Sequence, residues 1–188
     1  VVGFSPCKYP ALESHAIERT YTPMIGLENK TLTSQRLEYR LLAQADKESL
    51  AGLLRSPSVT KPAGFLPADS EEAFDQFFSE LTRCHTAVAI LHHDQLIGYF
   101  HVNQYNLSQE AYAHKSCVGV GFVIGKDYQK QGFGTEMLRR MTQYLLSVFD
   151  VCVADCFKEN VPSRKTIERC GYAYLEDYTM FFDALGQE

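Results

Sequence analysis

The sequence predicts a mixed α/β domain in which helices cover both faces of one sheet. Residues 118–143 have the pattern of an apolar strand, a glycine-containing loop and a helix, and residues 149–157 form a further apolar run. A right-handed crossover places these two strands parallel to each other. Thr86–Leu91 and Leu96–Val102 are apolar runs joined by a tight turn at His92–Gln95, which is typical of an antiparallel hairpin. A sheet with both kinds of pairing and helices between its strands belongs to the mixed class.

The chain before this region divides into an arm and the start of the domain. Residues 1–30 carry breaks at proline and glycine and no clear period, so we expect an N-terminal arm, with a single domain over 31–188. Leu32–Leu42 alternates apolar and polar residues and predicts one half-buried strand. Ala45–Leu54 has a leucine-rich face and predicts a helix, whereas the prolines of Lys61–Pro67 indicate a loop.

The remaining elements follow from caps and apolar periods. They are a helix capped by Asp69 with Glu72 three residues on and running to about Arg83, a polar loop at 103–115, a helix capped by Asn160 and stopped at Gly171, and short strands at Tyr172–Leu175 and Tyr178–Phe182.

Composition excludes several classes of function. Hydrophobic residues make up 45% of the 188-residue chain, which is ordinary for a globular protein. The net charge of −5 argues against nonspecific nucleic-acid binding. No apolar run approaches the roughly 20 residues of a membrane span, and no leader pattern is present, so we expect a cytoplasmic protein without membrane contact. The six cysteines lack Cys-x-x-Cys spacing, which predicts reduced thiols and no metal site.

The glycine-containing loop between the strand and the helix of residues 118–143 has the chemistry of an anion site. Free N–H groups and the positive end of a helix dipole converge there, and a phosphate fits such a site. A Walker loop is excluded because Thr135 follows Gly134 without an intervening lysine. A dinucleotide fingerprint is excluded because Met137 stands where its third glycine is needed.

The remaining pattern is Gln-x-x-Gly-x-Gly, at Gln129, Gly132 and Gly134, and it resembles the acetyl-CoA pyrophosphate loop of the GNAT superfamily of N-acetyltransferases. Asn160-Val161-Pro162-Ser163 and Glu168-Arg169-Cys170-Gly171-Tyr172 resemble the last helix of its RimJ/RimL-like branch, which acetylates ribosomal-protein N-termini and related amines. Arg36-Leu37-Glu38-Tyr39-Arg40 matches the branch's early-strand pattern. The resemblance implies a GNAT-type, mostly antiparallel twisted sheet with a central splayed parallel pair.

The resemblance also implies acetyl-CoA as co-substrate, with no metal. The pantetheine arm would pair with the main chain of Phe122, Val123 and Ile124, like an added strand. Asn160 would face the cysteamine end near the thioester and is a candidate catalytic residue there, although it is also typical of a plain helix cap. Ser163 would likewise contact the cofactor. Lys130 would add charge, although it also reads as a solvated lysine. The pyrophosphate would lie on the amides of Gln129, Lys130, Gln131, Gly132, Phe133, Gly134 and Thr135.

The catalytic groups are less clear than the cofactor site. Ser163 is the candidate to protonate or hydrogen-bond the leaving sulfur, and an N–H near Ile124 would polarise the carbonyl. Many superfamily members place a tyrosine where Ile167 stands, and the branch often carries a glutamate where Gly119 stands, so two usual acid–base groups are missing. His114 is the first candidate to replace them, and the other candidates are Tyr105, Tyr112 and Glu176.

Three hypotheses follow for function. The first is acetylation of a protein or peptide α-amine, which costs only about 1.4 kcal/mol to deprotonate at pH 7, against about 4.6 kcal/mol for a side-chain amine. The second is acetylation of a small amine such as a polyamine, an amino acid or an aminoglycoside. The third is a non-catalytic acyl-CoA-binding module. The unexplained N-terminal arm would suit a homodimer.

Overall fold

The computed structural model describes residues 25–63, 70–105, 110–112 and 114–175. The arm over 1–24 and the expected strand at Tyr178–Phe182 therefore lie outside the described residues. The strands are β1 (Leu32–Thr33), β2 (Glu38–Leu41), β3 (Ala87–His92), β4 (Gln95–Gln104), β5 (Cys117–Ile124) and β6 (Val151–Ala154). The helices are α1 (Lys47–Leu54), α2 (Pro57–Ala63), α3 (Glu71–Arg83), α4 (Phe133–Leu145) and α5 (Val161–Arg169), with 3₁₀ turns η1 (Gln44–Asp46), η2 (Glu110–Tyr112) and η3 (Lys126–Tyr128).

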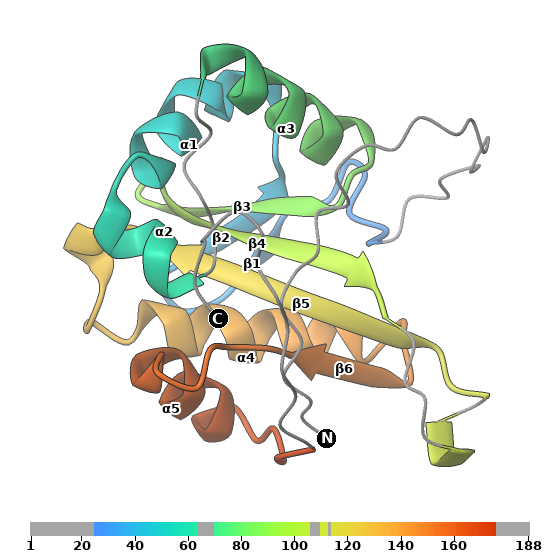
Figure 1. The fold of residues 1–188 in the computed structure, drawn as a ribbon. Coiled ribbons are helices and arrows are strands. Elements are labelled where there is room, and N and C mark those ends of the chain that lie inside the picture. The colour runs from blue at the N-terminus through green and yellow to red at the C-terminus, as the bar shows by residue number, and fades with distance from the viewer. Residues whose placement is uncertain (1–24, 64–69, 106–109, 113, 176–188) are drawn as a thin grey trace.

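The strands form one six-stranded sheet in the order β1-β2-β3-β4-β5-β6 (Figure 1). Neighbours are antiparallel from β1 to β5, and the pair of β5 and β6 is parallel. The predicted hairpin of β3 and β4 and the predicted parallel pair are thus confirmed. Within the described residues the parallel pair lies at one end of the sheet.

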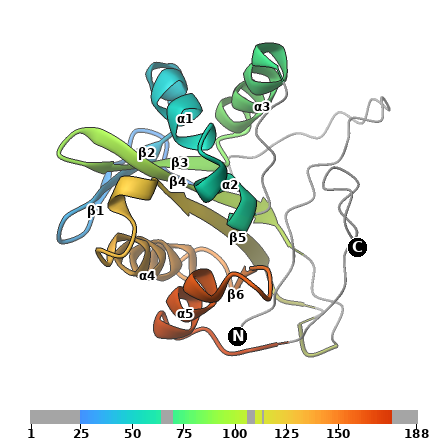
Figure 2. The same ribbon diagram turned by 60° about the vertical axis from the view of Figure 1, so that its left-hand side comes forward.

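Helices cover the two faces in separate groups (Figures 1 and 2). One face packs on α4 and α5, through a core that includes Val118, Val120, Met137, Leu138 and Ile167. The other face packs on α1, α2 and α3, through residues that include Leu50, Val59, Phe78, Tyr99 and Val123. Because side chains alternate along a strand, even-numbered residues of β5 face α4 and odd-numbered residues face the other group.

The parallel pair opens into a fork. Pairing between β5 and β6 ends at Val120 and Ala154, while β5 continues to Ile124. Beyond Val120, the edge of β5 that faces away from β4 has no strand partner among the described residues. This fork lies between the loop that opens α4 and the N-terminus of α5 (Figure 2).

Three expectations for local structure are wrong. Leu32–Leu42 is a hairpin of β1 and β2, in which Leu32 pairs with Tyr39, and not one strand. The alternation holds only over residues 36–41, and the polar residues Ser34 and Gln35 that precede it lie in the turn. Residues 57–63, expected to end one helix and open a loop, form helix α2, which Pro57 begins at the position where its missing N–H is harmless.

The third wrong expectation is the strand at Tyr172–Leu175, because these residues do not form a strand. The Tyr172 hydroxyl is instead hydrogen-bonded to the Thr142 hydroxyl at 2.6 Å.

The caps of α3 and α5 can be compared with their predictions. Asp69 lies outside the described residues, and the observed cap of α3 is Ser70, whose hydroxyl accepts the N–H of Ala73 at 3.1 Å. Asn160 caps α5 as predicted. In the ranges that the structure describes, no helix is both long and apolar enough to cross a membrane.

A partly buried ion pair joins the sheet to the turn η1, which precedes the first helix. Arg40 on β2 donates from Nη1 and Nη2 to the two carboxylate oxygens of Asp46 at 2.6 and 2.8 Å, and the Ala43 N–H donates to the same group at 2.8 Å. Burial raises the pKa of Asp46, but the bonds from Arg40 and Ala43 outweigh it and leave the pKa below its usual value. The pair therefore stabilises the fold above the unfolded pKa, and this stabilisation is lost as the pH falls.

We expect Asp46→Ala to lower the free energy of unfolding by about 2–4 kcal/mol, because it leaves the Arg40 guanidinium and the Ala43 N–H without their acceptor. Urea unfolding measures this loss. Asp75→Ala is the matched control, since Asp75 pairs with Lys47 at the surface and its removal should leave the midpoint unchanged. Equal effects of the two variants would contradict a structural role for Asp46.

Candidate functional site

The loop between β5 and α4 is shaped by two residues in the left-handed region. Lys130 has φ +61° and Gly132 has φ +86°. A Cβ at Gly132 would lie 3.4 Å from Nη2 of Arg36, so glycine serves both the conformation and the close approach. Left-handed residues turn neighbouring N–H groups toward one side in loops that bind anions.

The first turn of α4 leaves its N–H groups unused. Gly132 is the N-cap and provides no side-chain bond, and the first intrahelical bond runs from the Glu136 N–H to the Gly132 carbonyl at 3.0 Å. The N–H groups of Phe133, Gly134 and Thr135 precede that bond, so they have no acceptor within the helix. Together with the helix dipole they form a site for an anion.

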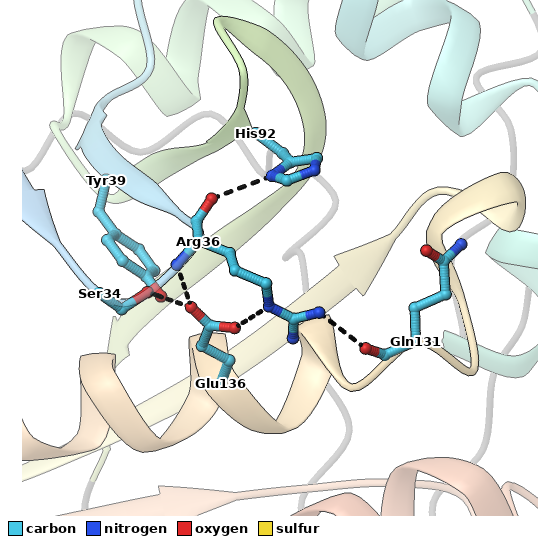
Figure 3. Close-up of polar contacts among 6 residues, drawn as sticks. All are labelled: Ser34, Arg36, Tyr39, His92, Gln131 and Glu136. Atoms are coloured by element: carbon cyan, nitrogen blue, oxygen red, sulfur yellow. Dashed lines mark hydrogen bonds and ion pairs between the residues drawn. The ribbon is translucent and has the colours of Figure 1, made fainter.

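A polar network fastens this turn to the β1–β2 hairpin (Figure 3). Glu136 accepts hydrogen bonds from the Ser34 hydroxyl, the Arg36 N–H and Arg36 Nε, each at 2.7 Å. Arg36 Nη1 donates to the Gln131 carbonyl at 3.1 Å, and its guanidinium carbon lies 4.2 Å from the centroid of the Phe133 ring. Burial raises the pKa of Glu136, but the bonds from Ser34 and Arg36 lower it by more, so this carboxylate is ionised at neutral pH.

Further side chains hold the loop from within. Gln129 donates from Nε2 to the carbonyl of Ile124 at 2.9 Å, and Gln131 donates to the carbonyl of Asp127 at 2.7 Å. The His92 ring contacts that of Phe133, with centroids 4.8 Å apart. The loop is therefore held in shape before any ligand binds.

A surface hollow of about 510 Å³ lies beside the loop. Four arginines are among its lining residues: Arg36, Arg139, Arg140 and Arg169. Although the whole chain carries a charge of −5, these guanidinium groups make the potential near the loop locally positive.

The loop opens onto the fork. A Cβ at Gly134 would lie 3.8 Å from Cγ2 of Thr166 on α5 and 3.9 Å from Cγ1 of Ile124 at the end of β5. The predicted main-chain segment Phe122, Val123 and Ile124 pairs with β4 on one side only. The structure thus brings the predicted loop residues, this segment and α5 around one opening.

The N-terminus of α5 is tied to the opposite helical layer. The Asn160 side chain accepts the Ser163 N–H at 3.2 Å and donates to the carbonyl of Pro62 in α2 at 2.6 Å. Asn160 is thus a helix cap and an anchor for α2, and both ends of its amide bond within the protein. The Ser163 hydroxyl hydrogen-bonds the Cys156 thiol just beyond β6, next to the fork.

Ile167 and Gly119, the two residues that depart from the superfamily pattern, are both closely packed against neighbouring residues. Ile167 is fully buried and belongs to the core beneath α4 and α5. A Cβ at Gly119 would lie 2.9 Å from the amide atoms of Asn103 and 3.0 Å from the Tyr105 ring, so a longer side chain does not fit there without a shift.

The candidate replacements for the missing acid–base groups lie away from the fork. His114 is exposed and precedes the first residue of β5, at the end opposite to the loop, so the structure does not bring it to the site. Tyr105 and Tyr112 pack against Cys117 and Val151 at that same end. Glu176 lies outside the described residues.

Sequence reasoning missed a carboxyl group at the fork. Asp155 directly follows β6, its side chain is half-buried, and its Oδ1 atom is buried without a hydrogen-bond partner. Burial raises its pKa to about 9, so the carboxyl is protonated at neutral pH. The only sequence signal was its place after an apolar strand. In the described ranges, no cluster of three or more His, Cys, Asp or Glu side chains could hold a metal.

A family model for the acetyltransferase (GNAT) domain matches residues 36–173. No curated protein sequence gives a significant match. Among solved structures, a GNAT-family acetyltransferase from Bacillus anthracis is 20% identical with a TM-score of 0.62, covering 75% of this chain and 82% of that one.

Two further structures share the fold. A Vibrio cholerae protein assigned as a ribosomal-protein-serine acetyltransferase is 23% identical with a TM-score of 0.59, covering 75% of this chain and 82% of that one. The spermidine N-acetyltransferase of Vibrio cholerae, solved with CoA and spermine, is 17% identical with a TM-score of 0.61, covering 73% and 81%.

The raised pKa of Asp155 predicts how the free energy of unfolding changes with pH. Because its folded pKa of about 9 exceeds the unfolded value of about 4, the stabilisation from its neutral form is complete below the unfolded pKa and is lost as the pH rises through the folded pKa. Between about pH 5 and about pH 8, the free energy of unfolding of the wild type should fall relative to that of Asp155→Asn by up to about 1.4 kcal/mol per pH unit.

Urea titrations over this range measure the slope. Asp150→Asn, at the other end of β6, is the control; hydrogen bonds from Ser116 hold the pKa of Asp150 below its usual value, so this variant should show no slope relative to the wild type. Parallel curves for the wild type and Asp155→Asn would contradict the raised pKa.

Proposed function

The chain belongs to the GNAT acetyltransferase family, and we propose that it transfers the acetyl group of acetyl-CoA to the α-amine at the N-terminus of a protein or peptide. Acetyl-CoA is the co-substrate, and the reaction is that of an N-acetyltransferase. The acceptor and the residues that act on it are the parts proposed here.

The observation that carries the proposal is the uncapped turn at the fork. The N–H groups of Phe133, Gly134 and Thr135 would bind the pyrophosphate of acetyl-CoA, together with the amides of Gln129, Lys130, Gln131 and Gly132. The arginine-lined hollow beside them would attract the polyanionic cofactor. Lys130 is exposed and free to add charge at the mouth.

The pantetheine arm would lie along the unpaired edge of β5. Its amides would hydrogen-bond the main chain of Phe122, Val123 and Ile124 in place of the strand that β6 no longer supplies. This path leads from the loop into the fork, where the thioester would lie beside Ser163. An N–H near Ile124 would polarise the thioester carbonyl.

Side chains at the N-terminus of α5 would stabilise the leaving thiolate. The Ser163 hydroxyl would hydrogen-bond the departing thiolate, because it already bonds a thiol, that of Cys156, at this position. Asn160 would support the site through its cap and its bond to Pro62 and would not contact the reacting atoms. His114 has no part in the proposal because it lies at the far end of β5.

The α-amine is favoured by its proton chemistry. An α-amine costs about 1.4 kcal/mol to deprotonate at pH 7, against about 4.6 kcal/mol for a side-chain amine. A site whose usual positions for a general acid and base hold Ile167 and Gly119 suits the less demanding acceptor. The similar Vibrio cholerae protein assigned to ribosomal proteins is consistent with this choice.

A small-molecule amine is the second candidate. It is favoured by the similarity to a spermidine N-acetyltransferase, which shares this fold at 17% identity. A polyamine presents several ammonium groups and therefore calls for several acidic partners in the acceptor site.

The test is release of CoA thiol from acetyl-CoA with a panel of peptides of varied N-terminal residue, polyamines, amino acids and aminoglycosides. We expect release that depends on peptides with a free α-amine and is abolished when that amine is blocked by prior acetylation. Release only with polyamines or aminoglycosides would establish the second candidate. Tight acetyl-CoA binding without release from any amine would favour a non-catalytic acyl-CoA-binding module.

Gly134→Leu should raise the Kd for acetyl-CoA about tenfold or more. The new side chain would fill the space between Thr166 and Ile124 and displace the pyrophosphate from the N–H groups, and loss of one hydrogen bond to a charged group accounts for such a factor. Titration calorimetry measures it. Gly52→Ala is the control, because Gly52 has open space around it in α1, far from the loop; this variant should keep the Kd and gain about 0.5–1 kcal/mol of stability. Equal Kd values in all three proteins would contradict the assigned cofactor site.

A further inference from the structure

The side chains of β6 alternate between the two faces of the sheet, and this alternation distinguishes two sides of the fork. Val151 and Val153 of β6 lie on the face opposite α4, and Cys152 and Ala154 lie on the α4 face. Continued alternation directs Asp155 to the same face as Val153 and Cys156 to the α4 face. Cys156 packs against the α4 core, as this alternation requires.

Three neighbouring strands bring three positions into a row on the face of Asp155. His101 of β4 is paired with Gly121 of β5, and Asp155 follows Ala154, the partner of Val120. His101 therefore lies beside Gly121 on β4, and Asp155 is the first residue past the end of the β5–β6 pairing, on the other side of Gly121, where β6 no longer pairs with β5. A Cβ built at Gly121 meets no atom of the described residues within 4 Å, so within the part of the chain that the structure describes the middle of the row is open.

We propose that Asp155 accepts the proton of the acceptor amine and that the amine docks in the open position over Gly121, an inference that rests on the acetyl transfer proposed above. The buried Oδ1 atom of Asp155, which has no hydrogen-bond partner, is the acceptor that an incoming N–H group would satisfy. An amine is a ligand of matching chemistry, since it brings donors to a carboxyl group that lacks one.

The step balances with acetyl-CoA as the second reactant. The amine lone pair attacks the carbonyl carbon of the thioester, a C–N bond forms, and the C–S bond breaks with its electron pair leaving on sulfur. Asp155, which is protonated at neutral pH, first loses its proton to solvent. The amine nitrogen then gives one proton to the resulting carboxylate, which becomes a carboxylic acid again. The thiolate takes a proton from solvent while the Ser163 hydroxyl donates to it.

The surroundings of Asp155 suit a proton acceptor. Burial is what raises its pKa to about 9, and a high proton affinity matches that of an amine. Its titratable neighbours are Cys156 beside it and His101 across Gly121, and the charged groups of Arg164 and Glu168 on α5 act on Cys156. Burial lowers the pKa of His101 to about 4, so this ring is neutral and adds no charge. Burial raises the pKa of the Cys156 thiol to about 11, so it too is neutral.

The two faces then separate the two substrates. Ser163 and Cys156 lie toward α5, where the thiol of CoA would leave, and Asp155 and Gly121 lie toward the layer of α1, α2 and α3. The amine would then approach one face of the planar thioester carbonyl from the side of α1, α2 and α3, while the sulfur leaves on the side of α5.

The experiment compares kcat against pH for the wild type and Asp155→Asn, at saturating acetyl-CoA and with the amine found active in the panel. We expect the wild-type kcat to rise with pH through a titration that Asp155→Asn lacks, and kcat of the variant to be lower by about a hundredfold or more. Glu159→Gln removes an exposed carboxylate four residues away and should keep both kcat and the pH profile.

Two further measurements separate a catalytic role from misfolding. Asp155→Asn should keep the wild-type Kd for acetyl-CoA, and its infrared difference spectrum against the wild type at neutral pH should show loss of a protonated carboxyl band. Gly121→Val should raise the KM for the amine about tenfold or more without changing the Kd for acetyl-CoA, because it fills the docking position.

The outcomes are distinct. Turnover by the wild type that Asp155→Asn matches at every pH would overturn the inference and leave the proposed function intact. A wild-type kcat that falls with pH, with the fall absent from the variant, would make Asp155 an acid for the leaving group and overturn its assignment to the amine. Absence of wild-type turnover with any amine would overturn the proposed function, and this inference with it.

Discussion

The ion pair between Arg36 and Glu136 is the interaction on which the site depends most. An exposed ion pair contributes little by itself, but Glu136 accepts three hydrogen bonds at 2.7 Å, and Arg36 also bonds the Gln131 carbonyl and covers the Phe133 ring. Two segments 100 residues apart are thereby joined, and the turn of the β1–β2 hairpin becomes a support for the loop that opens α4. A preformed cradle of N–H groups needs such a support, because nothing within the first turn of a helix satisfies those groups.

The second constraint is the early end of β6. Pairing with β5 stops at Val120, so among the described residues the rest of β5 has an edge without a strand partner, which leads from the loop toward the N-terminus of α5. Asn160 then ties α5 to α2 across this opening, which fixes the distance between the helical layers at the point where they meet. The main-chain groups on this unpaired edge are the ones that we propose to bind the pantetheine arm.

At the two positions that depart from the superfamily pattern, packing explains the residue that is present. Ile167 and Gly119 hold no acid or base because one is fully buried in the core and the other lies against Asn103 and Tyr105. A carboxyl group is nevertheless present one strand away, at Asp155, where burial and the absence of a bonding partner for Oδ1 give it a high proton affinity. If Asp155 accepts the proton of the amine, as we propose, the group that handles the proton lies on a neighbouring strand and faces the same opening.

The sequence by itself determined the elements whose causes are local. The apolar run of β5, the helical period of α4, the turn between β3 and β4 and the Asn160 cap all depend on residues within one or two turns of each other, and each agrees with the structure. It also indicated the anion site, because the glycine spacing and the helix start lie in one short stretch. The tertiary structure alone decided the β1–β2 turn, the bond of Glu136 to Arg36, the packing of Gly119 and the burial of Asp155. These depend on side chains brought together from distant parts of the chain, and both hydrogen bonding across that distance and the loss of water from a carboxyl group leave no trace in a local pattern of residues.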